Sequence, residues 1–232
     1  AAAECPPGRG FAAALAADGL QIIAEIKRRS PSAGALAPNI SPGDQATSYA
    51  AGGAAAISVL TEPDFFSGSL HDLEQVRREV ELPLLRKDFI LHEAQIAEAK
   101  LAGADAILLI VAALEEGRLR SLLHSAERLE LDALVEAHNE AELAVANRVG
   151  ATLVGINNRD LTTFVTDLST AEGLAANVVA PVKVAESGVS DIAGAGRMAA
   201  AGYDAILVGE ALVRSDDPAA LVAALRSAAG SA

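Results

Sequence analysis

The stretch AGGAAAISVL at residues 51–60 decides the fold, because three other stretches repeat its pattern: LAGADAILLI at 101–110, RVGATLVGIN at 148–157 and AAGYDAILVG at 200–209. In each, a helix-like segment ends at a glycine, and a short apolar run begins one or two residues later. Glycine readily adopts the left-handed conformation that ends many helices, and such apolar runs indicate buried strands. The repeat recurs about every 50 residues, with its glycines at Gly53, Gly103, Gly150 and Gly202.

A second set of apolar runs lies between the repeats: QIIAEIK at 21–27, LPLLRKDF at 82–89, LDALVEA at 131–137 and APVKVAES at 180–187. Together the two sets predict eight strands about 25 residues apart, separated by amphipathic segments such as 115–130 and 191–201. Strands that alternate with helices pair in parallel. We therefore predict an α/β protein with one domain, residues 1–232, folded as a (β/α)8 TIM barrel.

An open, doubly wound sheet is the alternative to the barrel. It normally has fewer strands and a glycine-rich first turn, and neither G-x-G-x-x-G nor G-x-x-x-x-G-K occurs here. We see no linker and no second domain in the sequence.

Composition narrows the class of protein. The 232 residues carry a net charge of −13 and no basic stripe, which argues against a nucleic-acid partner. The longest apolar run, 106–114, is about half the length that a membrane span needs. A single cysteine, Cys5, allows no internal disulfide and is typical of a reducing compartment. We expect a soluble cytoplasmic protein that binds neither membrane nor nucleic acid.

Polar residues stand where the predicted strands end, which is where barrel enzymes carry their active sites. Alternation along a strand places Lys87 on the same side as Leu85, and Glu136 on the same side as Leu134, so both continue an inward-facing row. Each polar residue alone could be part of a structural ion pair, a loop cap or a turn. Together they indicate a catalytic site, because a network of charged residues at one end of the barrel is less stable than apolar residues would be there. The set is Glu25, Lys27, Lys87, Glu136, Asn157, Arg159, Glu186 and Ser187.

Two glycine turns predict a phosphate site. Ser187 and Gly188 follow the seventh strand, and Gly209 follows the eighth. Backbone N–H groups at such turns, at the start of the next helix, form the recurring phosphate site of barrels. The alternative is that both glycines only turn the chain.

The four histidines are interpreted as ordinary surface residues, because no pair of them has metal-ligand spacing with a nearby acid. They are His71, His92, His124 and His138. We therefore predict no metal, and no motif indicates a cofactor.

Eight phrases give the chain a specific resemblance. IIAEIKRRSPS, SVLTEPDFFSGS, PLLRKDFI, GADAILLIV, LVEAHNEAEL, GINNRDL, VAESGV and ILVGEAL occur in this order between residues 21 and about 214. The chain resembles the indole-3-glycerol-phosphate synthases of tryptophan biosynthesis. The resemblance implies a ribulose-phosphate-binding barrel that needs no cofactor and acts on a small sugar phosphate. Other enzymes of the tryptophan pathway are possible partners.

The resemblance also implies a reaction and roles in it. The family converts 1-(2-carboxyphenylamino)-1-deoxyribulose 5-phosphate to indole-3-glycerol phosphate, carbon dioxide and water. An aromatic carbon attacks the ribulose carbonyl, whose oxygen gains a proton, and Lys87 matches the general acid that supplies it. Glu136 matches the residue for later proton transfers, with Lys27 near the departing hydroxyl.

Other roles follow from the same resemblance. Lys27, Ser30 and Arg159 would bind the anthranilate carboxylate, while Glu25 and Asn157 would orient the sugar hydroxyls and the catalytic ammonium. Glu186 and Ser187 would complete the rim. An apolar wall for the substrate ring would come from Phe66, Phe89 and Leu108.

The sequence departs from the family pattern in two places. Family members usually carry about one more helix before the first strand, so residues 1–20 would be a shortened leader. Glu210 follows Gly209 where a serine is common. Its carboxylate would repel phosphate, so we expect only the backbone N–H of this residue to bind it.

Three rival functions remain. The isomerase of the preceding pathway step uses a cysteine and an aspartate, but Cys5 precedes the first strand and lies out of reach. A Schiff-base aldolase would use Lys87 or Lys183 as its amine. A catalytically silent barrel would bind sugar phosphates or a partner protein without turnover.

Overall fold

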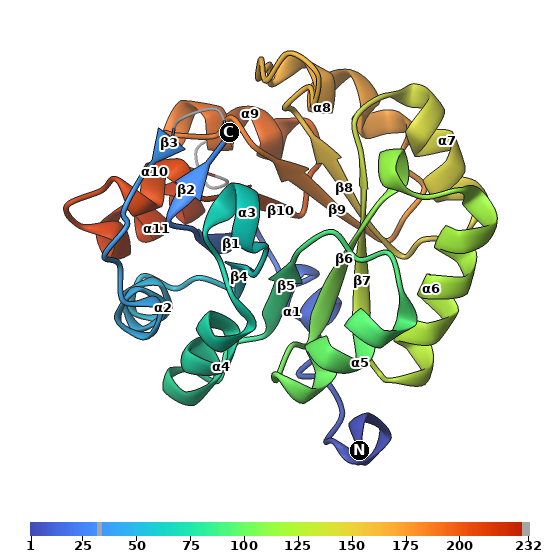
Figure 1. Ribbon diagram of the computed structural model, residues 1–232. Coiled ribbons are helices and arrows are strands. Elements are labelled where there is room, and N and C mark those ends of the chain that lie inside the picture. Colours follow the sequence, from blue (N-terminus) through green and yellow to red (C-terminus); the bar gives the residue numbers. More distant parts are fainter. Residues whose placement is uncertain (32–33, 229–232) are drawn as a thin grey trace.

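A closed barrel of parallel strands forms the centre of the computed structural model, which describes residues 1–31 and 34–228 (Figure 1). Neighbouring strands around the barrel follow the order β1-β10-β9-β8-β7-β6-β5-β4. Each of the predicted apolar runs is one barrel strand: β1 Gln21–Ile26, β4 Ala56–Leu60, β5 Leu84–Lys87, β6 Ala106–Ile110, β7 Asp132–Ala137, β8 Leu153–Asn157, β9 Val182–Glu186 and β10 Ala205–Val208. The predicted (β/α)8 barrel is confirmed, and residues 229–232 of the predicted domain lie outside the described residues.

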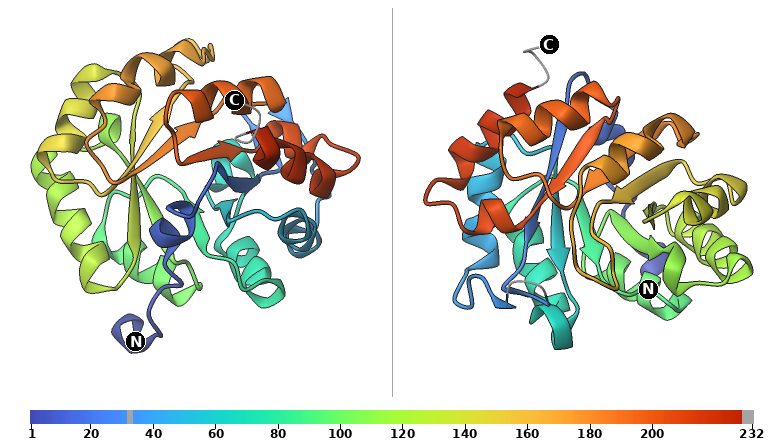
Figure 2. Two further views of the ribbon diagram at one scale, coloured as in Figure 1. Left: turned by 180° about the vertical axis from the view of Figure 1, so that it is seen from behind. Right: turned by 90° about the horizontal axis from the view of Figure 1, so that it is seen from above.

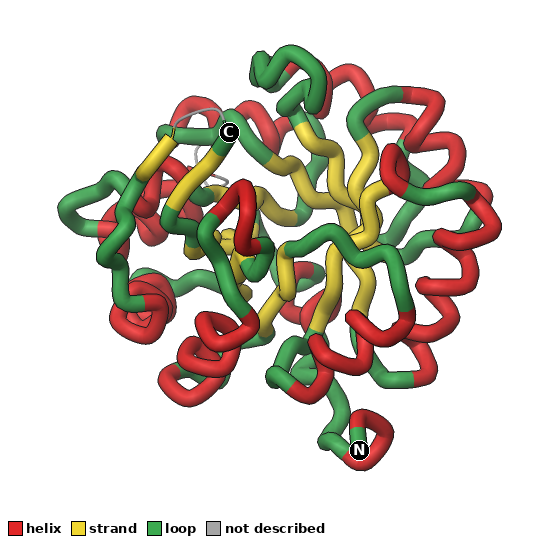
Figure 3. The backbone as a smooth tube through the Cα atoms, in the orientation of Figure 1, coloured by secondary structure: helices red, strands yellow, loops and turns green. Residues whose placement is uncertain are grey.

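Helices surround the strands, as Figure 3 shows with the helices in red and the strands in yellow. The larger ones are α2 Pro42–Ala51, α4 Leu70–Glu79, α5 Glu93–Leu101, α6 Glu116–Arg128, α7 Glu140–Arg148, α8 Ser169–Leu174, α9 Ile192–Ala200 and α11 Pro218–Ser227. Side-chain caps start several of them: Ser41 accepts the N–H of Asp44, and Asn139 accepts that of Glu142. The repeated glycines end them as predicted, with φ of 85° at Gly53 and 90° at Gly103.

The strands separate two hydrophobic cores. The larger core packs the outer faces of the strands against the helices. The smaller core fills the barrel and includes Ile23, Leu85, Leu134 and Leu153. The inward direction predicted for these rows is therefore confirmed, and Lys87 and Glu136 continue two of them beyond the packed interior.

The described leader residues cover the N-terminal ends of the strands. The short helix α1 Phe11–Leu15 buries Phe11 and Leu15 completely in the inner core. Its Ala12 N–H donates to Oδ2 of Asp132, the first residue of β7, at 2.9 Å. Seen from behind in Figure 2, this N-terminal segment crosses the barrel end, after the single turn η1 Ala2–Glu4. It lies at the opposite end of the barrel from Lys87, the last residue of β5.

Short elements line the other end of the barrel, where the strands finish. They are the antiparallel pair β2 Arg29–Ser30 and β3 Gly34–Ala35, the short helices α3 Pro63–Phe66 and α10 Glu210–Val213, and η2 Val111–Ala113. The 3-10 turn η3 Ala175–Asn177 extends α8. Among the described residues, no helix combines the length and the apolar character that crossing a membrane requires.

Candidate active site

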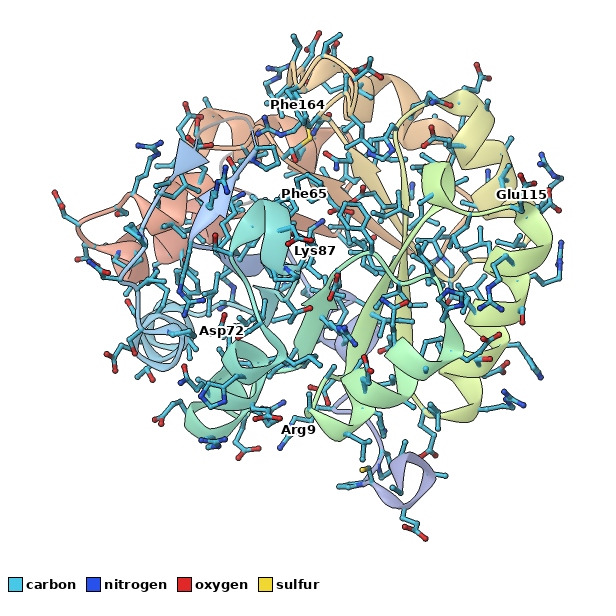
Figure 4. The ribbon with its side chains drawn as sticks, in the orientation of Figure 1. Arg9, Phe65, Asp72, Lys87, Glu115 and Phe164 are labelled. Carbon is cyan, nitrogen blue, oxygen red and sulfur yellow. The ribbon has the colours of Figure 1, made fainter. Side chains whose placement is uncertain are left out.

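One cavity of about 500 Å³ opens at the C-terminal ends of the strands and brings the predicted site residues together. Figure 4 shows Lys87 near the centre of this end, close to α3 with its Phe65, and Phe164 on the loop above. Every residue singled out for the site lines the cavity: Glu25, Lys27, Ser30, Phe66, Lys87, Phe89, Leu108, Glu136, Asn157, Arg159, Glu186, Ser187, Gly188, Gly209 and Glu210. Residues that are far apart in the sequence therefore lie together around the opening of one cavity.

Lys87 lies between two glutamates. Its Nζ is 3.2 Å from Oε2 of Glu136 and 3.1 Å from Oε2 of Glu186. Burial alone would lower the pKa of the Lys87 ammonium, but the carboxylates of Glu136, Glu186 and Glu25 raise it above its ordinary value. Lys87 is therefore held as a charged acid that points into the cavity.

The pKa values of the two glutamates that contact Lys87 are shifted in opposite directions. Burial opposes ionisation of Glu136, yet Lys87, His138 and a hydrogen bond from Asn157 together lower its pKa. Burial raises the pKa of Glu186, and the neighbouring charge of Glu136 adds to this in spite of Lys87. Groups whose pKa values are pushed apart in this way can act as base and acid in one site.

Glu25 and Lys27 form a second charged pair at the end of β1. Oε1 of Glu25 is 2.7 Å from Nζ of Lys27, and the two side chains are 4% and 14% exposed. The buried Tyr49 hydroxyl donates to the backbone carbonyl of Glu25 at 3.1 Å and holds the strand end. The pair stands on the inward side of β1, as alternation predicts, and faces the cavity.

Hydrogen bonds near the strand ends hold three further predicted residues in place. Glu62 caps α3 by accepting the N–H groups of Asp64, Phe65 and Phe66 at 2.7–3.3 Å, which places Phe66 on the cavity wall. Oδ1 of Asn157, the last residue of β8, accepts the backbone N–H of Arg159 at 3.0 Å, so the start of the following loop is held against the strand end.

The turn after β9 differs in one respect from the prediction. Ser187 and Gly188 both have positive φ, 64° and 85°, so their backbone does turn sharply at the cavity. The next helix, α9, begins only at Ile192 and is capped by Asp191. Gly188 is therefore not at a helix start, whereas Gly209 directly precedes α10.

The interpretation of His138 as a surface residue is wrong. Its side chain is 8% exposed, because the turn after β7 folds it between Glu136 and Glu142. His71, His92 and His124 are exposed as predicted. The spacing of histidines along the chain indicates metal ligation or its absence and does not predict burial, which for His138 comes from its contacts with Glu136 and Glu142.

Several residues that line the cavity were not predicted from the sequence. Leu161, Phe164 and Thr166 line the cavity from the loop after β8, and Arg214 lines it from the end of α10. These residues lie beyond the strand ends, where alternation no longer predicts a direction. In the described parts of the chain, no group of three or more His, Cys, Asp or Glu side chains could hold a metal ion.

Comparison with known proteins decides the family. The family model described as indole-3-glycerol phosphate synthase matches residues 1–225. The chain belongs to the indole-3-glycerol phosphate synthase family. The eight phrases that suggested this family include Lys87, Glu136, Asn157 and Glu186, which the structure brings to one cavity.

Bacterial members of the indole-3-glycerol phosphate synthase family are similar over nearly the whole chain. The enzymes of that name from Rhodococcus jostii (strain RHA1) and Mycobacterium ulcerans (strain Agy99) are each 50% identical over 98% of this chain, which covers 85% and 84% of their lengths. Among solved structures, a thiamine phosphate pyrophosphorylase from Pyrococcus furiosus matches with a TM-score of 0.69 at 18% identity, over 91% of this chain and 96% of that chain. That likeness concerns the barrel fold alone.

Gly155 on β8 makes room for Glu186, and its replacement gives the first test. A Cβ at this position would lie 2.1 Å from Oε1 of Glu186, so Gly155→Ala must displace that carboxylate from Lys87. We expect kcat to fall about tenfold or more, because ångström-scale misplacement of catalytic groups has effects of this size. Steady-state kinetics measure the change, with circular dichroism to confirm folding.

Gly117→Ala on α6 is the matched control, since a Cβ there meets nothing within 4 Å. The control should keep wild-type kcat. Equal kinetics for the two variants would contradict the role given to Gly155.

Proposed function

We propose that this chain catalyses the decarboxylating, dehydrating ring closure of 1-(2-carboxyphenylamino)-1-deoxyribulose 5-phosphate to indole-3-glycerol phosphate. The observation that carries the proposal is an ammonium, that of Lys87, which is only 14% exposed and is held between Glu136 and Glu186 at the mouth of the cavity, in a member of this family. The product lies on the route to tryptophan.

Ring closure is the step assigned to Lys87. The carbonyl oxygen of the ribulose chain gains negative charge as the aromatic carbon attacks, and a proton from a positioned ammonium removes that charge. The raised pKa keeps Lys87 protonated before the substrate binds. The cavity admits the substrate to this ammonium from the open end of the barrel.

Loss of the hydroxyl is the step assigned to Glu136 and Lys27. After carbon dioxide leaves, the hydroxyl departs as water, and the neighbouring CH2 group must lose a proton. Glu136 is held ionised and can take that proton, while the Lys27 ammonium can protonate the departing oxygen. Glu25, 2.7 Å from Lys27, aims this ammonium and with Asn157 orients the sugar hydroxyls.

The anthranilate part of the substrate would occupy the side of the cavity near β2 and the loop after β8. Lys27, Ser30 and Arg159 line the cavity and would bind the carboxylate. Phe66, Phe89 and Leu108 would pack against the ring and exclude water from the reacting carbons.

The phosphate would bind to backbone N–H groups of the turns at Ser187–Gly188 and Gly209–Glu210. Nε of Arg214 is 3.1 Å from Oε1 of Glu210, so the two side chains form an ion pair. Arg214 also lines the cavity, which adds a positive group to this turn. A dianionic phosphate could replace Glu210 as the ion-pair partner of the Arg214 guanidinium.

Replacing Arg214 tests this part of the proposal. Arg214→Gln should raise KM about tenfold, the effect of losing one charge-assisted hydrogen bond, while kcat changes less than about twofold. Arg148→Gln is the control, because Arg148 pairs with Glu116 and does not line the cavity. An unchanged KM in Arg214→Gln would place the phosphate elsewhere.

The rival functions fit the geometry less well. A Schiff-base lysine must be neutral to attack a carbonyl, but the carboxylates around Lys87 favour its charged form. Lys183 donates to the carbonyl of Ala175 at 3.4 Å and does not line the cavity. Cys5 lies in the leader, at the end of the barrel away from Lys87. A silent barrel would have no need of three charged groups held together.

Turnover of the wild-type chain is the test of the proposed function. The named substrate should yield a product with indole absorbance and fluorescence, together with one carbon dioxide for each indole formed. A folded protein that forms no indole from this substrate would overturn the proposal.

A further inference from the structure

Glu136 has two tasks in the proposed reaction, and both need its negative charge. It holds the Lys87 ammonium in place, and it later takes a proton from the CH2 group of the substrate. Between the two tasks, Lys87 gives its proton to the carbonyl oxygen and becomes a neutral amine. Glu136, which is 2% exposed, then loses the cation beside its Oε2. A buried carboxyl group without a cation favours its protonated form, which cannot act as a base.

A second cationic side chain contacts Glu136 at its other oxygen. Nε2 of His138 is 3.2 Å from Oε1 of Glu136, and Nζ of Lys87 is 3.2 Å from Oε2. The His138–Glu136 contact is a close charge contact rather than an aligned hydrogen bond. The His138 side chain is 8% exposed and is not part of the active-site wall. His138 therefore lies behind Glu136, away from the substrate, and takes no part in proton transfer to the carbonyl.

The contacts of the His138 ring indicate an imidazolium. Nδ1 is 2.9 Å from Oε2 of Glu142, which also accepts the backbone N–H of His138 at 2.9 Å. An ionised carboxylate can only accept hydrogen bonds, so a ring nitrogen that faces one carries a proton. Nδ1 faces Glu142 and Nε2 faces Glu136. A neutral ring would instead direct the lone pair of Nε2 toward Oε1 of Glu136, and the two would repel each other.

Acidic groups on three elements surround this ring. Glu136 belongs to β7 and Glu142 to α7, while Asp160 and Asp167 on the loop after β8 line a cavity of about 470 Å³ that His138 also lines. Burial would lower the pKa of His138, but Glu136 and Glu142 raise it to about 9. The imidazolium is therefore present at neutral pH and loses its proton only at alkaline pH.

Glu186 is the internal comparison for Glu136. Its Oε2 is 3.1 Å from Nζ of Lys87, but among the described residues its Oε1 has no hydrogen-bond partner. Burial raises the pKa of Glu186 in spite of Lys87. Burial opposes ionisation of Glu136 too, yet Lys87, His138 and the Asn157 amide lower its pKa. The two carboxyl groups share one ammonium, so His138 and Asn157 account for the difference between them.

We propose that His138 is a positioning residue whose positive charge keeps Glu136 ionised and in place while Lys87 is a neutral amine. This inference rests on the proposed function, because ring closure is the step that discharges Lys87. His138 touches no reacting atom and neither gains nor loses a proton during turnover. Glu136 takes its proton from the substrate and can pass it to the adjacent Lys87.

Single-turnover kinetics of His138→Gln separate this role from a merely structural one. Carbon dioxide should form within about threefold of the wild-type rate, because ring closure uses Lys87, which Glu186 still contacts. At about pH 6, indole should form at least about tenfold more slowly, because Glu136 is then mostly protonated. Carbon dioxide should therefore run ahead of indole by up to about one molecule per active site.

The pH dependence of this lead follows from the charge that is removed. Loss of the His138 cation raises the pKa of Glu136, so the base is lost as the pH falls through the raised value. Raising the pH to about 8.5 should return indole formation to within about threefold of wild type and abolish the lead. The wild-type chain should show no lead at either pH. A merely structural role would slow both products together at every pH.

NMR of the wild-type chain with isotope-labelled histidine measures the charge of the ring directly, and it serves if His138→Gln does not fold. Both ring nitrogens of His138 should carry a proton at neutral pH, and one proton should be lost only near pH 9. His124→Gln is the matched control for the kinetics, because that side chain is 71% exposed on α6. It should form both products at wild-type rates.

Three results would each overturn the role given to His138 while leaving the proposed function intact. They are a neutral His138 ring at neutral pH, wild-type indole formation by His138→Gln at acidic pH, and equal slowing of carbon dioxide and indole at every pH. A folded wild-type chain that forms neither product would instead overturn the proposed function, and with it the need for this charge.

Discussion

Replacing Lys87 by methionine is expected to lower kcat at least about a thousandfold, which is within the range for loss of a general acid. Methionine has a similar length but no proton to give to the carbonyl oxygen. In the wild-type chain, Nζ of Lys87 lies 3.2 Å from Oε2 of Glu136 and 3.1 Å from Oε2 of Glu186. These two carboxyl groups remain in the variant, and neither can supply the missing positive charge. Substrate should still bind, because the proposed contacts to its carboxylate and phosphate are untouched.

Titration calorimetry and steady-state indole formation together measure this result. Lys183→Met is the matched control, since Lys183 lies on β9 and does not line the cavity. It should keep wild-type turnover. A Lys87→Met variant with near-normal kcat would mean that another group supplies the proton.

The second large effect is expected for Glu136→Gln. The amide keeps the size of the side chain but removes the charge that faces Lys87 and His138. We expect kcat to fall about a hundredfold, as for loss of a proton-transfer group, with KM within about threefold. Removal of the neighbouring charge should also lower the pKa of Glu186, because Glu136 helps to raise it.

Steady-state kinetics over a range of pH test this prediction. Glu140→Gln is the control, because Glu140 is exposed at the start of α7. A Glu136→Gln variant that loses no more activity than this control would remove Glu136 from the mechanism.

The barrel was predictable because its signals are local and repeated. A glycine such as Gly53 ends a helix in the left-handed conformation, and the apolar run after it forms the next strand, as in β4. Alternation along a strand then predicts which side chains face inward. Leu85 and Lys87 share one side of β5, so alternation beyond a buried leucine predicted that Lys87 faces the cavity.

The rest of the site depends on loops and on contacts between distant elements. His138 directly follows β7, and its ring lies between Glu136 on that strand and Glu142 on α7, a contact that depends on how the helix packs. Phe164 reaches the cavity from an irregular loop, and Arg214 does so from the end of a four-residue helix. The delayed start of α9 likewise depends on how residues 187–191 turn, which no periodic pattern describes.

A crystal structure with a bound inert analogue tests the central claim most directly. In the analogue, the ribulose carbonyl is reduced to a hydroxyl, so ring closure cannot begin. Our account predicts that this oxygen lies within hydrogen-bond distance, about 3 Å, of the Lys87 Nζ, with the aromatic ring against Phe66 and Leu108. An analogue bound with its phosphate or carboxylate on Lys87, and its reduced carbon elsewhere, would contradict the account.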